Sequence, residues 1–152
     1  MYKLALALAI VALVCVGAPA RSQEPTAVDK NAPVSLLGDY QIVLVEISGE
    51  KEPEERSVGA LVHVTEEQLL VEDRDHKSTP YIASYEVDTK KKPNVITMTG
   101  LIAPTKDVTV KGLVEREGDQ LRLIYALPGG EMPNDFKSKD KQVLIVMKSV
   151  AK

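Results

Sequence analysis

Cysteine and histidine are scarce in this sequence. Its 152 residues include one cysteine, Cys15, and two histidines, His63 and His76, which lie in different segments. Nucleophilic catalysis of the triad kind needs a nucleophile, a histidine and an acid in one place, and no such set can be assembled here. An isolated histidine on an outward strand position is far more often a surface residue than a metal ligand. We therefore expect a protein that is not an enzyme and that has no metal site and no cofactor.

A basic surface is missing as well. The formal net charge is −3, and it becomes −4, with 18 basic against 22 acidic residues, if a leader containing Lys3 is removed. This balance argues against nucleic acid or an anionic membrane surface as the main partner. The one basic run, Lys90 to Lys92, stands beside a proline in a predicted turn, where a run of charge is usually just solvated.

The chain has one long apolar run, and it is too short to span a bilayer. Thirteen apolar residues, 4–16, follow Lys3 and precede Ala18-Pro19-Ala20. A transmembrane helix needs about 20 apolar residues, whereas this pattern is typical of a secretory signal peptide. We predict a signal peptide over residues 1–20, cleaved after Ala20, with an uncleaved anchor as the alternative. The mature protein would be exported, either periplasmic or secreted, without stable membrane insertion, and would contain no cysteine for a disulfide or a thiol nucleophile.

Past the signal, the sequence predicts a linker and one all-β domain. Residues 21–35 hold two prolines and scattered polar residues without periodicity, which indicates a flexible linker. Residues 36–149 have the length of one domain and show no long amphipathic helix pattern. Short stretches of strand-forming residues separated by turn signals favour an antiparallel up-and-down β-barrel of roughly eight strands. The predicted strands are 40–47, 60–65, 68–73, 81–88, 95–99, 108–116, 120–127 and 142–148.

The hairpin at 108–127 fixes a register. Its central residues 118–119 are Gly-Asp, which suits a two-residue turn because glycine accepts a positive φ. Counting from the turn places Glu115 opposite Arg122 on one face. It places Gly112 opposite Tyr125 on the other, where the missing side chain would leave room for the tyrosine ring.

Alternation in the other strands predicts which side chains face inward. These are Tyr40, Ile42 and Leu44 in the first strand, Val62 opposite Val71 and Val64 opposite Leu69 in the second hairpin, Tyr81, Ala83, Tyr85 and Val87, and then Ile96 and Met98. Residues 128–141 form the longest polar insertion and carry the only phenylalanine, Phe136. An aromatic ring of that size hides a large apolar area, so we expect Phe136 to cover one end of the core, as a plug or as a lid over the barrel mouth.

Three segments together resemble a family. LLGDY near the start, YEVDTKKKPNVITMT in the middle, and GLVEREGDQLRLIYALPGGEMPNDF followed by QVLIVMK at the end are similar to the uncharacterised lipocalin-like domain family of planctomycete bacteria, over roughly residues 36–148. The resemblance implies a lipocalin-like barrel and no established activity. Such domains usually begin with Gly-x-Trp, where this chain has Gly38-Asp39-Tyr40, and tend to have Arg before Pro in the late loop, where it has Met132-Pro133.

Two functions remain open from the sequence. An eight-stranded barrel can hold one small ligand or be filled by its own side chains. The first hypothesis is therefore a monomeric, exported protein that binds a small apolar ligand. The second is a filled barrel that acts as a structural or protein-interaction module with a partner protein of the cell envelope. The candidate ligand-binding residues, in the barrel interior and at its mouth, are Tyr40, Tyr81, Tyr85, Tyr125 and Phe136.

Overall fold

The computed structural model describes residues 35–150, with the exception of residue 76. The predicted signal peptide at 1–20 lies outside the described residues, as do His76 and all of the predicted linker except Ser35. Within the described part, no helix is long and apolar enough to cross a membrane.

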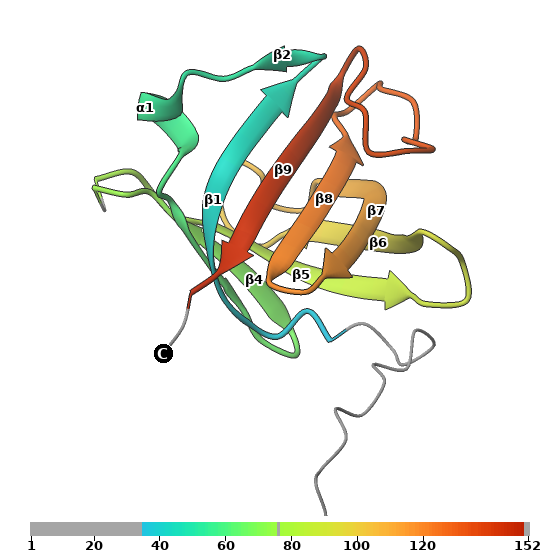
Figure 1. The fold of residues 1–152 in the computed structure, drawn as a ribbon, viewed down its shortest axis with the longest axis horizontal. Coiled ribbons are helices and arrows are strands. Elements are labelled where there is room, and N and C mark those ends of the chain that lie inside the picture. Colours follow the sequence, from blue (N-terminus) through green and yellow to red (C-terminus); the bar gives the residue numbers. More distant parts are fainter. Residues whose placement is uncertain (1–34, 76, 151–152) are drawn as a thin grey trace, which may run out of the picture. The chain divides into compact units, whose positions relative to one another are not determined.

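The fold is an all-β antiparallel barrel, which confirms the predicted class (Figure 1). The elements are β1 (Gly38–Ile47), β2 (Glu50–Lys51), α1 (Glu54–Ser57), β3 (Leu61–Val64), β4 (Gln68–Glu72), β5 (Tyr81–Asp88), β6 (Asn94–Gly100), β7 (Thr109–Glu117), β8 (Gln120–Ala126) and β9 (Gln142–Ser149). From β3 onward each strand pairs with the next in sequence, and β1 pairs with both β3 and β9. In the described residues the wall therefore closes with eight strands, while β2 pairs only with the end of β1.

The predicted hairpin registers are confirmed. Gly112 pairs with Tyr125 and Glu115 with Arg122 across β7 and β8, and Gly118 has the positive φ, 61°, that the turn requires. Val62 pairs with Val71, and Val64 with Leu69, across β3 and β4. The reason for glycine at position 112 differs from the expected one. A Cβ there would lie 2.0 Å from the Ile124 carbonyl oxygen, so the backbone of β8, more than the ring of Tyr125, requires the glycine.

The first strand differs from the prediction after Ile42. Its pairing with β9 shifts between Ile42 and Leu44, and this β-bulge places one extra residue in β1. Val43 and Leu44 consequently both pack in the outer cluster, and the inward position passes to Val45. The predicted inward position of Leu44 is therefore wrong. Between the predicted strands 40–47 and 60–65, the structure has the short elements β2 and α1.

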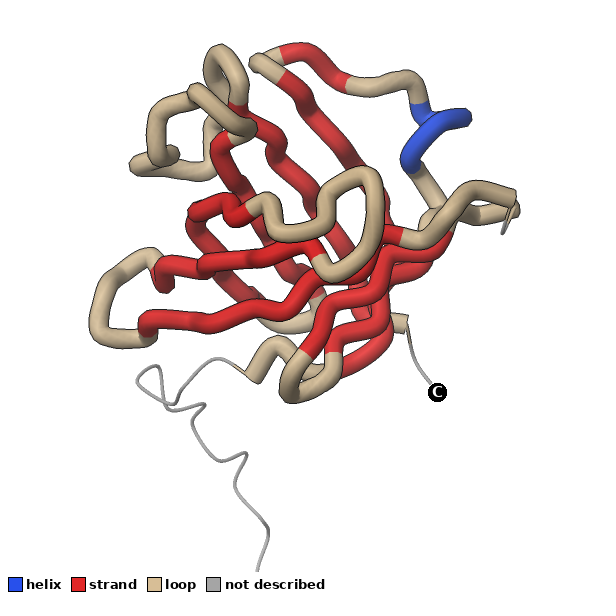
Figure 2. Tube along the Cα trace, turned by 180° about the vertical axis from the view of Figure 1, so that it is seen from behind, coloured by secondary structure: helices blue, strands red, loops and turns tan. Residues whose placement is uncertain are grey.

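Two apolar clusters lie on opposite faces of the wall. The larger one fills the barrel interior and includes Tyr40, Val62, Met98 and Leu123. The smaller one lies on the outer face, where Leu113, Ile124 and Leu144 are direct neighbours across β7, β8 and β9. Figure 2 shows the wall from behind, with the longer connections between strands in tan.

Up-and-down topology divides those connections between two ends of the barrel. One end, called here the closed end, holds the short turns 65–67 and 118–119 and the entry to β1. The other end, called the open end, holds the longer connections 73–80, 101–108 and 127–141. The last of these lies beside the β1 to β2 turn at the top of Figure 1, where the Gly49 amide donates to Ser138 Oγ at 2.8 Å.

Candidate functional site

The barrel interior contains an apolar cavity of about 190 Å³. Side chains from seven strands line it, and all of them belong to the interior cluster. They are Ile42, Val62, Leu69, Val71, Tyr81, Met98, Leu123, Tyr125, Ile145 and Met147. The cavity exists because alternate residues on successive antiparallel strands point to one face.

The cavity is reached from the open end. Its half-buried lining residues include Val71 and Tyr81, which pair with each other beside the 73–80 connection, and Tyr125 near the end of β8. Toward the closed end the lining residues Leu69 and Met147 are buried. Three of the four half-buried lining residues thus lie toward the open end, although Val62, the partner of Val71, is buried there.

The cavity lining contains two hydroxyl groups, those of Tyr81 and Tyr125. Burial raises the pKa of both phenols above the ordinary value, and that of Tyr125 to about 12, with the nearby Tyr81 phenol adding to the rise. Both side chains are therefore protonated at neutral pH and can donate a hydrogen bond. Among the described residues, neither hydroxyl has a hydrogen-bond partner in the protein, in contrast to the hydroxyls of Tyr40 and Tyr85.

The other two predicted tyrosines close the opposite end. Tyr40 is 1% exposed, and its hydroxyl donates to the Leu36 carbonyl at 2.8 Å. The Arg116 guanidinium lies 5.8 Å from the centre of the Tyr40 ring and donates to the Ser35 carbonyl at 3.0 Å. Burial raises the pKa of Tyr40, and the charge of Arg116 partly opposes the rise. These contacts tie residues 35–36 across the closed end.

Tyr85 also has a satisfied hydroxyl. It donates to the Thr65 carbonyl at 2.6 Å, in the turn between β3 and β4. Its pKa is raised by burial first and then by the Tyr40 and Glu66 groups. Neither Tyr40 nor Tyr85 lines the cavity, so both hydroxyls serve the barrel structure.

Phe136 lies outside the barrel, contrary to expectation. It packs in the outer cluster with Leu113, Ile124 and Leu144, and the Arg122 guanidinium lies 4.9 Å from its ring centre. Its loop folds back along the wall because the buried Gln142 side chain bonds to both limbs of the loop, donating to the Glu131 carbonyl and accepting from the Lys139 amide, each at 3.0 Å. Phe136 is therefore neither a plug of the interior nor a lid over its mouth.

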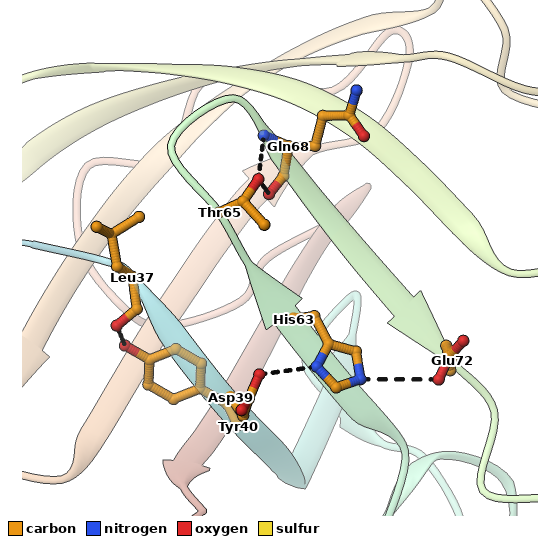
Figure 3. Close-up of polar contacts among 7 residues, drawn as sticks. All are labelled: Leu37, Asp39, Tyr40, His63, Thr65, Gln68 and Glu72. Atoms are coloured by element: carbon orange, nitrogen blue, oxygen red, sulfur yellow. Dashed lines mark hydrogen bonds and ion pairs between the residues drawn. The ribbon is translucent and has the colours of Figure 1, made fainter.

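The outer wall carries a polar cluster of which the sequence analysis identified only the histidine, His63. His63 on β3 points outward between two carboxylates (Figure 3). Its Nδ1 lies 2.8 Å from Asp39 Oδ1 on β1, and its Nε2 lies 3.7 Å from Glu72 Oε2 on β4. The nearby Thr65 hydroxyl is engaged with the Gln68 backbone of the same turn. This arrangement links three strands on the surface, where such polar contacts contribute little to stability.

The alternation of the strands predicts the inward position of several residues that line the cavity, although only aromatic residues were proposed as ligand-binding candidates. The alternation predicts that Ile42, Val62, Leu69, Val71 and Met98 face inward, and the register of the β3 to β4 hairpin brings Val62, Leu69 and Val71 together. In residues 35–75 and 77–150, no group of three or more histidine, cysteine, aspartate or glutamate side chains could hold a metal ion. No family model matches the chain, and neither a curated protein nor a solved structure matches it.

Proposed function

We propose that this protein is an exported, lipocalin-like, non-enzymatic binding domain that holds one small, mostly apolar molecule inside its barrel. The observation that carries the proposal is the cavity of about 190 Å³, which is lined by apolar side chains and reached from one end. An apolar cavity of about 150 Å³ in another protein stays dry and takes up benzene. A single aromatic ring with a short substituent is therefore the right size of ligand here.

The division of the interior supports binding over a purely structural role. The closed end is filled by Tyr40 and held by Arg116 and Leu36. A barrel built only for stability would gain from the same packing throughout, because empty space in a core loses contact energy. Here the space lies around Tyr81 and Tyr125, and the filled end acts as its floor.

The lipocalin-like part of the proposal rests on architecture and on one residue. Gly38-Asp39-Tyr40 stands where such domains carry Gly-x-Trp, and Tyr40 is fully buried at the floor of the barrel. Export rests on the predicted signal peptide. The N-terminal sequence of the protein recovered outside the cytoplasm tests it, and a chain that still begins at Met1 would refute cleavage after Ala20.

Toluene binding tests the proposed function. Ligand-observed NMR should show uptake by the wild-type protein and a large loss in Val71→Phe, because the added ring would occupy the cavity. Leu70→Phe is the matched control, since it adds a ring to the same strand on the outward face, opposite His63. Equal binding by both variants would place the bound toluene elsewhere. Absence of uptake by the folded wild-type protein would favour the filled structural or protein-interaction module.

A further inference from the structure

The cavity has a marked chemical asymmetry. Eight of its ten lining side chains are aliphatic or methionine, and the only hydroxyls are those of Tyr81 and Tyr125. A cavity meant for a hydrocarbon alone has no need of tyrosine at these positions, since phenylalanine would supply the same ring. Two hydroxyls in such surroundings are the kind of polar group that fixes a ligand's orientation.

Neither hydroxyl is used by the protein in the described part of the chain. The other two interior tyrosines donate to backbone carbonyls at 2.8 Å and 2.6 Å, whereas no such bond forms at Tyr81 or Tyr125. Neither oxygen is among the fully enclosed polar atoms that lack a partner, so each keeps accessible surface. Both side chains line the cavity, and burial raises the pKa of each phenol.

The two phenols line the same cavity. The Tyr81 phenol adds to the effect of burial on the pKa of Tyr125. Both are neutral donors at neutral pH, and a carbonyl oxygen has two lone pairs that can accept one hydrogen bond from each. No lining side chain carries a charge, and a buried carboxylate or ammonium without a partner would be strongly disfavoured.

We propose that Tyr81 and Tyr125 select a neutral carbonyl compound, a small ketone or aldehyde whose apolar body fills the rest of the cavity. The proposal rests on the proposed function, because it names the ligand class of that same cavity. A body of about nine non-hydrogen atoms suits the volume, by comparison with benzene in a slightly smaller cavity. The hydroxyls determine specificity, and the aliphatic lining supplies most of the affinity.

Acetophenone and α-methylstyrene form a matched pair for the test. They have the same heavy-atom connectivity and nearly the same size, and the carbonyl oxygen of the ketone is replaced by a methylene group in the alkene. The affinities of both are measured by NMR titration of the wild-type protein, Tyr81→Phe, Tyr125→Phe and the double variant. Tyr85→Phe is the control, because Tyr85 lies on the same strand and face as Tyr81 but its hydroxyl is bonded to Thr65.

The ratio of the two affinities is the readout. Each phenylalanine in the cavity should weaken acetophenone binding by about fivefold, the effect of one neutral hydrogen bond, and should leave α-methylstyrene binding equal or tighter. Tyr85→Phe should leave the ratio unchanged. If both ligands bind and the ratio is the same in all variants, carbonyl selection is wrong while the cavity still binds. If neither ligand binds the folded wild-type protein, the proposed function fails and carbonyl selection fails with it.

Discussion

Replacing Gly112 by alanine should destabilise the barrel strongly. A Cβ built at this position would lie 2.0 Å from the Ile124 carbonyl oxygen and 2.8 Å from Tyr125 Cα. Carbon and oxygen atoms in contact are normally about 3.3 Å apart or more, so β8 would have to move by about 1 Å. We expect a loss of about 3 kcal/mol, from overpacking and from weakened ladder hydrogen bonds. This is a large share of the stability of a typical domain.

Gly118→Ala is the control for the general cost of losing a glycine. No heavy atom lies within 4 Å of a Cβ at Gly118, and its only constraint is a φ of 61°. That conformation should cost about 1 kcal/mol for alanine. Urea unfolding of the two variants measures the difference directly. Similar losses for both variants would mean that β7 and β8 are not in close contact at Gly112, and the reasoning would be refuted.

Three further predictions concern the aromatic residues. Tyr40→Phe should lower the free energy of unfolding by about 1–2 kcal/mol, because the buried Leu36 carbonyl loses its donor, and unchanged stability in urea would contradict this. Burial raises the pKa of Tyr125 in the folded protein from 10.0 to about 12. The stabilisation by the neutral phenol is complete below about pH 10, and the free energy of unfolding should fall by up to about 3 kcal/mol as the pH rises toward 12. This fall should be smaller in Tyr125→Phe. Phe136→Ala should cost about 2 kcal/mol, because the half-buried Phe136 ring packs on the outer cluster, and should leave toluene binding unchanged. Weaker toluene binding in this variant would mean that Phe136 contacts the ligand.

The sequence predicted the barrel because its strongest signals are local. The turn at Gly118 and the alternation on either side of it determine the register of β7 and β8, and the pairing of Gly112 with Tyr125 follows by counting. The same logic located the β3 to β4 hairpin. Strand order then follows from the tendency of strands that are consecutive in sequence to lie next to each other.

The errors arose where both faces of a strand are apolar. Residues 40–47 are apolar at both parities, so the bulge that turns Leu44 outward leaves no mark in the alternation. Ile124 and Leu144 occupy outward positions, and this apolar outer surface is what Phe136 covers. The position of Phe136 depends on the long-range hydrogen bonds of Gln142, which no local pattern predicts. The cavity depends on the summed volumes of ten side chains, which a register alone does not determine.

A crystal of the protein soaked in iodobenzene would test the hollow, ligand-binding barrel most directly, because the anomalous signal of iodine locates the bound molecule. We predict one strong peak inside the barrel, enclosed by Met98, Leu123 and Tyr125, and its loss in Val71→Phe. A peak found only on the outer face beside Phe136, or no peak at all in the soaked crystal, would contradict a cavity that takes up a small apolar molecule.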